Sequence, residues 1–354
     1  MKIVSVVGAR PQFIKAVPVS KVLRHSGHRE ILVHTGQHYD YGMSQVFFEE
    51  LGISEPDTNL GVGSGPHGWQ TGQMLIRIEE VLAKEKPDWV LVYGDTNSTL
   101  AGAIASVKLQ IPLAHVEAGL RSFNREMPEE HNRLLTDHCS DLLFCPTQTA
   151  VANLDKEGIT HGVNLVGDTM YDAVLLFSEI AREKSTILDD LGLKSKEYLL
   201  ATVHRPYNTD IPENLENILS AFIEINEPII FPVHPRTRKI LNTFFPSLLT
   251  PHSSLKMIPP VGYLDMLMLE QNAKAILTDS GGMQKEAYWF EVTCVTFRDE
   301  TEWVETVEAG WNVVVGADTG KIVEAVRCLK SDNPRPKLYG DGHAAEKMLE
   351  ILAD

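Results

Sequence analysis

A short segment in the second half of the chain has the residue types of an anion-binding site. The apolar run Ala273–Leu277 precedes a helix-compatible stretch, and Ser280, Gly281 and Gly282 lie between them. Glycines at the mouth of a helix let an anion approach unpaired amides at the positive end of the helix dipole. One turn further in, Glu286 could accept hydrogen bonds from ribose hydroxyls. We predict a nucleoside diphosphate site here, although Ser-Gly-Gly is also common turn chemistry.

A second candidate for phosphate binding follows the first apolar run of the chain. Gly8 permits a tight turn, and Pro11 suits the first turn of a helix. Arg10 and Lys15 would then lie near the start of that helix, where they could meet a phosphate or simply face solvent. The dinucleotide pattern GxGxxG is absent from this turn, which argues against NAD binding.

Two acidic residues follow neighbouring apolar runs and could act as an acid and a base. Asp95 comes after Trp89–Tyr93, and Glu117 comes after Leu113–Val116. Both would project from the same edge of a parallel sheet. Asp95 could instead cap the next helix. Glu117 has no such structural role, so we expect it to pair with Arg121 or to be chemically active.

Glu129 and Arg133 are four residues apart and therefore share a helix face. An acidic first turn with an exposed ion pair would explain them without any function. Their expected position near Asp95 and Glu117 favours a role in catalysis instead.

Histidine and arginine residues follow the strands of the second half. His204 and Arg205 end one apolar run, His234 and Arg236 end another, and Arg298 follows a third. Together they predict a cationic lining for an anionic ligand. This half contains no HxxxH or HxH pair, so we predict no metal site.

The bulk properties restrict the classes of function. The chain has 354 residues, is 43% hydrophobic and carries a formal net charge of −16. This charge argues against a nucleic-acid binder or an anionic-membrane binder. The four cysteines have no CxxC spacing and are expected to be free thiols in apolar surroundings. No apolar stretch reaches the roughly 18 residues of a membrane span, and the N-terminus does not read as a signal peptide, so we expect a soluble, cytoplasmic protein.

Apolar runs alternate with helical patterns throughout the chain, which predicts an α/β fold with parallel sheets. Long helices are expected over Gln70–Lys86 and Thr96–Leu109. The predicted strands are Ile3–Val7, Glu30–Thr35, Trp89–Tyr93, Leu113–Val116, Leu142–Cys145, Asn164–Val166, Tyr198–Val203, Ile229–Val233, Leu255–Ile258, Ala275–Thr278, Cys294–Phe297 and Asn312–Val315.

The length suits two domains rather than one. We predict an N-terminal Rossmann-like domain of residues 1–167, completed by a C-terminal helix within 337–354, and a second Rossmann-like domain of residues 168–336. A ligand would bind in a cleft between them, at the carboxyl ends of the strands.

The ordered motifs resemble the non-hydrolysing UDP-N-acetylglucosamine 2-epimerases, a family with GT-B architecture. The likeness runs nearly end to end. It is carried by GARPQFIKA (8–16), HTGQHYD (34–40), YGDTNSTLAG (93–102), HVEAGLRSF (115–123), MPEEHNRLLTDH (127–138), ATVHR (201–205), VHPRT (233–237), LTDSGGMQKEA (277–287) and RDETEWVE (298–305).

The resemblance implies reversible inversion at C2 of the sugar, converting UDP-GlcNAc to UDP-ManNAc. UDP would leave by anti elimination, giving 2-acetamidoglucal, and then add back. No cofactor is needed, and a homodimer is expected. By resemblance Asp95, Glu117 and Glu129 are the catalytic carboxylates, Arg133 is a catalytic arginine, and His204 steadies UDP. The nucleotide-binding positions would be Arg10, Lys15, Ser280, Gly281 and Glu286.

Some positions depart from the family pattern. Tyr207 replaces a customary glutamate after His204-Arg205, and Glu291 replaces a customary glycine. The stretch His34–Gly52 also resembles a branch acting on modified sugars such as UDP-diacetamido-uronic acids. The alternatives are therefore a 2-epimerase of a related UDP-sugar and, from another class, an inactive UDP-sugar-binding protein. A glycosyltransferase would leave the three carboxylates without a task, and a hydrolysing variant would release free sugar.

Overall fold

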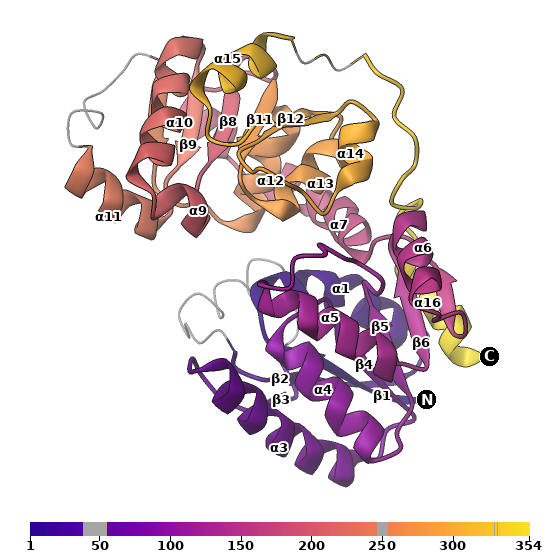
Figure 1. The fold of residues 1–354 in the computed structure, drawn as a ribbon. Coiled ribbons are helices and arrows are strands. Elements are labelled where there is room, and N and C mark those ends of the chain that lie inside the picture. Colours follow the sequence, from indigo (N-terminus) through magenta and orange to yellow (C-terminus); the bar gives the residue numbers. More distant parts are fainter. Residues whose placement is uncertain (38–54, 246–253, 329, 331) are drawn as a thin grey trace. The chain divides into compact units, whose positions relative to one another are not determined.

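The computed structural model describes residues 1–37, 55–245, 254–328, 330 and 332–354. The chain forms two compact units (Figure 1). Unit 1 comprises Met1–Leu176 and Lys337–Asp354, and unit 2 comprises Phe177–Pro336. The chain passes between the units twice, and neither connection is part of a sheet. The first lies within α7 (Thr169–Lys184), and the second precedes α16 (Ala344–Ala353).

Unit 1 contains a seven-stranded parallel sheet in the order β3-β2-β1-β4-β5-β6-β7. Its topological switch point lies between β1 and β4, where successive strands begin to be added on the opposite side. The strands are β1 (Lys2–Val7), β2 (Arg29–His34), β3 (Thr58–Asn59), β4 (Trp89–Tyr93), β5 (Leu113–Val116), β6 (Leu142–Cys145) and β7 (Val163–Leu165). Its other helices are α1 (Arg10–His25), α3 (His67–Glu85), α4 (Asn97–Lys108), α5 (Pro128–Cys139) and α6 (Gln148–Lys156).

Unit 2 repeats this order with six parallel strands, β10-β9-β8-β11-β12-β13, so its switch point lies between β8 and β11. The strands are β8 (Leu199–Thr202), β9 (Ile229–Pro232), β10 (Leu255–Ile258), β11 (Ala275–Thr278), β12 (Thr293–Thr296) and β13 (Asn312–Val314). The helices are α8 (Ile187–Leu191), α9 (Pro206–Thr209), α10 (Pro212–Ile225), α11 (Pro235–Phe244), α12 (Tyr263–Asn272), α13 (Gly281–Trp289), α14 (Val304–Glu308) and α15 (Thr319–Cys328).

The strands are buried on both faces because helices cover each sheet, as parallel sheets require. In unit 2, for example, apolar residues of α10 and α15 pack on one face, and those of α12 and α13 pack on the other. The predicted α/β class with two Rossmann-like sheets is confirmed. The two-residue strand β3 was not predicted, because so short a segment has no apolar run.

Among the described residues, no helix is both long and apolar enough to cross a bilayer. The cysteines are free thiols, as predicted, but their surroundings differ from the prediction. Cys145 and Cys294 are buried and Cys139 is partly buried, whereas Cys328 is exposed.

Candidate functional site

In unit 1 the turn after β1 brings the backbone unusually close to its neighbours. A Cβ at Gly8 would lie 2.0 Å from Ser98 Oγ and 2.3 Å from Thr35 Oγ1, so only glycine fits there. The Gln12 side chain accepts hydrogen bonds from the amides of Gly8 (2.7 Å) and Ala9 (3.0 Å). This turn positions the start of α1.

The two basic residues of α1 differ in their surroundings. Arg10 is the first residue of the helix and is exposed. Lys15, one turn further on, is partly buried, and its Nζ forms an ion pair with Glu117 Oε2. Lys15 is therefore part of a charge network and not a surface lysine.

Glu117 has an uncommon backbone conformation. It follows β5 directly and has φ +72°, in the left-handed region that costs a non-glycine residue of the order of 1–3 kcal/mol. The amides of Glu117 and Ala118 both donate to Phe144 O, at 3.1 Å each. Strain of this kind at a carboxylate is typical of functional sites. Arg121 is not its partner, because the Arg121 guanidinium pairs with Asp137 and Glu157 instead.

Asp95 does not cap a helix, so the alternative structural interpretation is wrong. Thr96 caps α4, and its side chain accepts from the Thr99 amide. Asp95 instead pairs with Arg133, whose Nη2 and Nε lie 2.6 Å and 3.1 Å from Asp95 Oδ2. Asn132 donates to the Asp95 carbonyl at 2.9 Å, so α5 holds the turn through two side chains.

Glu129 and Arg133 do not form the exposed ion pair that would make them surface residues. Arg133 is buried and pairs with Asp95 and with Glu130, whose Oε2 lies 2.8 Å from its Nη1. Burial alone would raise the pKa of Glu130, but hydrogen bonds from Ser122, Arg133 and Phe123 outweigh it and lower the pKa. Within the described residues Glu129 forms no ion pair, which leaves its carboxylate available at the start of α5.

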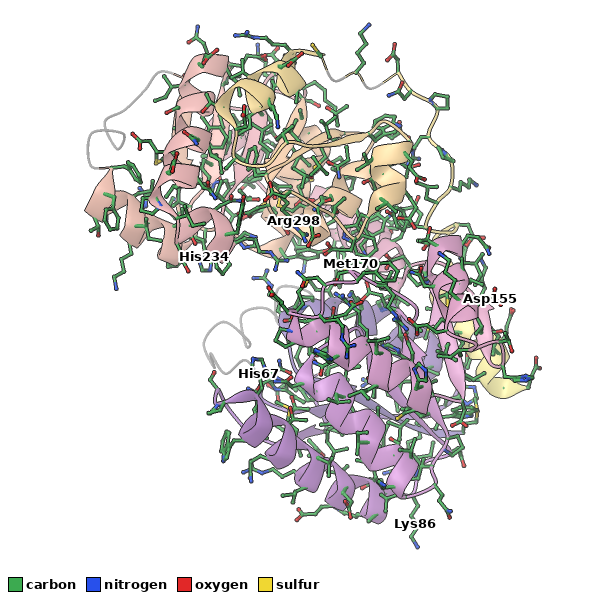
Figure 2. The ribbon with its side chains drawn as sticks, viewed as in Figure 1. His67, Lys86, Asp155, Met170, His234 and Arg298 are labelled. Atoms are coloured by element: carbon green, nitrogen blue, oxygen red, sulfur yellow. The ribbon has the colours of Figure 1, made fainter. Side chains whose placement is uncertain are left out.

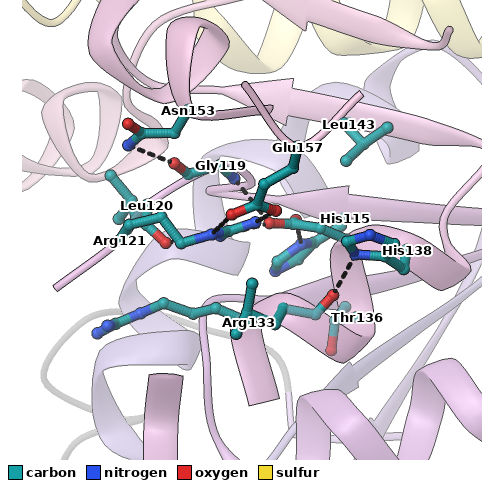
Figure 3. Close-up of polar contacts among 12 residues, drawn as sticks. His115, Gly119, Leu120, Arg121, Arg133, Thr136, His138, Leu143, Asn153 and Glu157 are labelled. Atoms are coloured by element: carbon teal, nitrogen blue, oxygen red, sulfur yellow. Dashed lines mark hydrogen bonds and ion pairs between the residues drawn. The ribbon is translucent and has the colours of Figure 1, made fainter. Parts of the chain in front are cut away.

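A buried network that the sequence did not reveal lies beside these groups (Figure 3). Asp137 accepts from Arg121 Nη1 (2.7 Å) and from the Gly119 amide (3.2 Å), and its other oxygen faces His115 Nδ1 at 2.7 Å. Arg121 also binds Glu157 through two bonds of 2.7 Å. Asp137 could have been noticed in the sequence, since it lies four residues after Arg133 and therefore on the same face of α5.

In unit 2 a buried carboxylate organises the switch point between β8 and β11. Asp279 is fully buried and accepts from the amides of His204 (3.1 and 3.0 Å) and Arg205 (2.9 Å) and from Asn208 Nδ2 (3.0 Å). Sequence reasoning assigned no role to Asp279 or Asn208. A carboxylate directly after a strand of small and apolar residues was the signal that could have identified Asp279.

The strand-end histidines His204 and His234 lie near each other in unit 2. The rings of His204 and His234 have centroids 6.3 Å apart. Burial lowers the pKa of His204; the charges of Arg205 and His234 add to this effect, and Asp279 opposes it. Burial therefore disfavours the charged form of the His204 imidazole.

The N-terminus of α13 has the properties expected of an anion site. Ser280 is its N-cap residue, yet the Ser280 side chain makes no capping hydrogen bond. A Cβ at Gly281 would lie 3.0 Å from Glu302 Oε1, and a Cβ at Gly282 would meet nothing closer than 3.9 Å. Glu286 is buried in the same helix, and Tyr263 Oη lies 3.4 Å from its carboxylate.

A cavity of about 450 Å³ lies beside these elements and is lined by Arg205, Pro206, Tyr207, Asn208, Arg298, Asp299 and Glu300. Arg298 and His234 are labelled in Figure 2, after the ends of β12 and β9 respectively. Arg298 Nη1 lies 2.9 Å from Glu302, so one charge of this cluster is already paired. The side chain of Arg236 lies outside the described part of the structure, as do residues 38–52 of the His34–Gly52 region.

A family model described as UDP-N-acetylglucosamine 2-epimerase matches residues 20–353. The chain belongs to this family. A UDP-N-acetylglucosamine 2-epimerase homolog of Methanococcus maripaludis is 58% identical, over 99% of each chain. The UDP-2,3-diacetamido-2,3-dideoxy-D-glucuronate 2-epimerase of Pseudomonas aeruginosa is 50% identical, over 100% of this chain and 99% of that one.

Solved structures of the epimerase family agree with the fold. The UDP-GlcNAc 2-epimerase of Methanocaldococcus jannaschii, in complex with UDP-GlcNAc and UDP, superposes with a TM-score of 0.89 at 46% identity, covering 100% of this chain and 99% of that one. The family resemblance and the GT-B-like fold class expected from the sequence are therefore confirmed.

Proposed function

We propose that this protein is a UDP-N-acetylglucosamine 2-epimerase that interconverts UDP-GlcNAc and UDP-ManNAc without a cofactor. The observation that carries the proposal is the polar cluster of unit 1. It combines a left-handed Glu117 paired with Lys15, an Asp95 held by Arg133, and a Glu129 without an ion pair among the described residues. The family relationship supplies the reaction that such a cluster would perform.

The chemistry requires one group to remove the C2 proton and another to return a proton from the opposite face. As the base takes this proton, the C2–H electrons form the C1=C2 bond and the C1–O bond to UDP breaks. In the return step a β-phosphate oxygen attacks C1 while C2 is protonated. We assign these two proton transfers to Asp95, Glu117 and Glu129, and we propose that Arg133 orients Asp95.

Unit 2 would hold the leaving group. Developing charge on the diphosphate needs preorganised donors. The amides of Ser280, Gly281 and Gly282 supply these at the start of α13, and Glu286 would bind the ribose hydroxyls. The further diphosphate ligands we propose are His204, His234 and Arg298 from unit 2, Arg236 from its sequence position, and Arg10 from unit 1.

Incubation with UDP-GlcNAc in deuterated water, followed by proton NMR, tests the function. Deuterium at C2 of a product that still carries UDP is the expected result. Free sugar would indicate hydrolysis, and unchanged substrate despite measurable UDP binding would indicate a binding protein; either result would overturn the proposal.

A second substrate is weighed because of the 50% identical Pseudomonas aeruginosa relative. We expect UDP-GlcNAc to be turned over faster than UDP-2,3-diacetamido-2,3-dideoxy-glucuronate in the same assay, and the reverse order would reassign the substrate. A homodimer stays a prediction, which sedimentation of the purified chain would check.

A further inference from the structure

The fully buried His115 occupies a position where a neutral imidazole does not fit. Its Nδ1 lies 2.7 Å from Asp137 Oδ1, and its Nε2 lies 2.7 Å from the carbonyl oxygen of Gly94. A carbonyl oxygen and a carboxylate accept hydrogen bonds but cannot donate them. A neutral ring has one N–H, so one of its nitrogens would face an oxygen lone pair at hydrogen-bonding distance.

A protonated Asp137 would be the other way to satisfy this contact, and its surroundings argue against it. Burial raises the pKa of Asp137, whereas the charge and hydrogen bond of the buried Arg121 guanidinium lower it, whatever the state of His115. Asp137 also accepts from Arg121 and from the Gly119 amide. With Asp137 ionised, both ring nitrogens of His115 donate, and the imidazolium balances the charges of Asp137, Arg121 and the partly exposed Glu157.

The imidazolium connects three segments that carry the proposed catalytic groups. Its Nε2 holds Gly94, the residue before Asp95. His115 itself lies two residues before the left-handed Glu117. Its Nδ1 binds Asp137 of α5, the helix whose Arg133 pairs with Asp95.

The Gly94 contact bears directly on Glu117. A Cβ placed on Gly94 would lie 3.3 Å from Glu117 Oε2 and 3.8 Å from Lys15 Nζ, so the Gly94 backbone packs directly against this ion pair. Gly94 also has φ +61° and donates to Val116 O at 2.9 Å. A shift of the Gly94 turn would therefore move the Asp95 carboxylate and also the backbone against which the Glu117 side chain packs.

We infer that His115, with both ring nitrogens protonated, is a positioning residue that sets the spacing of the Asp95 and Glu117 carboxylates for the 2-epimerase reaction. It does not touch the substrate and acts through Gly94 and Asp137. The inference rests on the proposed function, since it concerns the carboxylates assigned to that reaction.

Two substitutions separate the contacts of the ring. His115→Asn places an amide N–H near the position of Nδ1 and keeps the bond to Asp137, but it loses Gly94. His115→Gln places an amide N–H near the position of Nε2 and keeps the hydrogen bond to the Gly94 carbonyl, but it removes the hydrogen bond to Asp137. Because a displacement of about 1 Å in a reacting group can cost about 10²-fold in rate, we expect H115N to lower kcat by roughly this factor with KM little changed. We expect H115Q to be less stable than H115N yet closer to the wild-type kcat.

Glu157→Gln is the matched control, because it weakens the same network at Arg121 without touching Gly94 or His115. It should lower thermal stability and leave kcat within about twofold of wild type, since only a partly exposed ion pair changes. If activity falls only in proportion to the folded fraction in all three variants, His115 is only structural. A wild-type kcat in H115N would lead to the same conclusion.

If neither His115 variant folds, the wild-type protein still tests the inference. In protein labelled with 15N-histidine at pH 7.5, one imidazole should show two slowly exchanging ring N–H protons. Their absence would overturn the inference. A wild-type protein that leaves UDP-GlcNAc unchanged yet shows these two protons would refute the proposed function and leave the imidazolium in place.

Discussion

The switch points of the two units have the same strand order but use their charges differently. In unit 1, between β1 and β4, ionised side chains pair with one another, as Lys15 does with Glu117 and Arg133 with Asp95. In unit 2, between β8 and β11, the buried Asp279 is used to hold main-chain amides. One topology thus pairs ionised side chains with each other in unit 1 and a carboxylate with main-chain amides in unit 2.

Two glutamates sharpen this comparison. Glu117 in unit 1 and Glu291 in unit 2 both have left-handed backbones, with φ +72° and +57°. Glu117 is buried and follows a strand, with Lys15 as its partner. Glu291 is exposed after α13, and its partner Arg335 lies 3.0 Å away at the surface. The same strain therefore marks a proposed functional position in one unit and only a turn in the other.

The largest effect is expected at Glu117. Glu117→Gln keeps the shape of the side chain but removes a charge that general acid–base catalysis needs, so kcat should fall by about 10²–10⁴-fold. UDP binding, which we assign mainly to unit 2, should change less than about threefold. Exchange of the C2 proton in deuterated water and calorimetry with UDP measure the two quantities. Normal exchange in this variant would remove Glu117 from the catalytic set.

The next effect concerns the organising carboxylate of unit 2. Asp279→Asn places an amide NH₂ among N–H donors, and hydrogen bonds to a charged group contribute about 1.5–3 kcal/mol each. We expect amide exchange of β8 and β11 to accelerate and the Kd for UDP to rise by about 10-fold or more.

Asp141→Asn is the control for this variant. Asp141 is exposed and accepts one bond, from the Leu113 amide at 2.8 Å, which an asparagine oxygen can still accept. It should leave UDP binding unchanged, and similar exchange rates in both variants would contradict the role given to Asp279.

The fold was predictable to a large extent because parallel strands are buried runs with clear ends. Trp89–Tyr93, Leu113–Val116 and Ala275–Thr278 have the bounds that were predicted. Which polar groups would meet was harder to predict. The pairing of Lys15 with Glu117 joins residues 102 positions apart, and no local pattern encodes it.

The charge state of His204 was also beyond the sequence. Histidine and arginine residues at the strand ends suggested a cationic lining, but they do not show that burial lowers the pKa of His204, because desolvation disfavours the charged form. The network around His115 was missed because its members lie far apart in the sequence and meet only in the folded unit. Gly94 follows β4, Arg121 follows β5, Asp137 lies on α5, and Glu157 is the C-cap residue of α6.

The pH dependence of UDP affinity tests whether His204, at the switch point of unit 2, gains a proton when the diphosphate binds. Its pKa is lowered without ligand, and bound diphosphate would favour the imidazolium and raise it. Binding should then take up a proton, so UDP affinity should gain from His204 as the pH falls through the window between these two pKa values. UDP itself loses charge on acidification, because phosphate has a pKa near 6.

His204→Gln corrects for that loss. As the pH falls through this window, the ratio of the UDP dissociation constants of variant and wild type should increase. The increase can reach about tenfold per pH unit, which is the limit for one linked proton. A ratio that stays constant between pH 8 and pH 5.5 would show that His204 does not respond to the diphosphate.

The smallest effect is expected at Glu291, where the backbone strain has no proposed use. Glu291→Gly should relieve the left-handed conformation, which costs a side chain about 1–2 kcal/mol. It also loses an exposed ion pair worth about 0–1 kcal/mol and adds freedom to the unfolded chain. Glu291→Gln isolates the ion pair, since it keeps the strain. We expect the glycine variant to be more stable than the glutamine variant by about 0.5–1 kcal/mol in urea unfolding, with kcat unchanged in both. A glycine variant that is less stable than the glutamine variant would mean that the turn after α13 is not strained, and the comparison with Glu117 would then rest on the site alone.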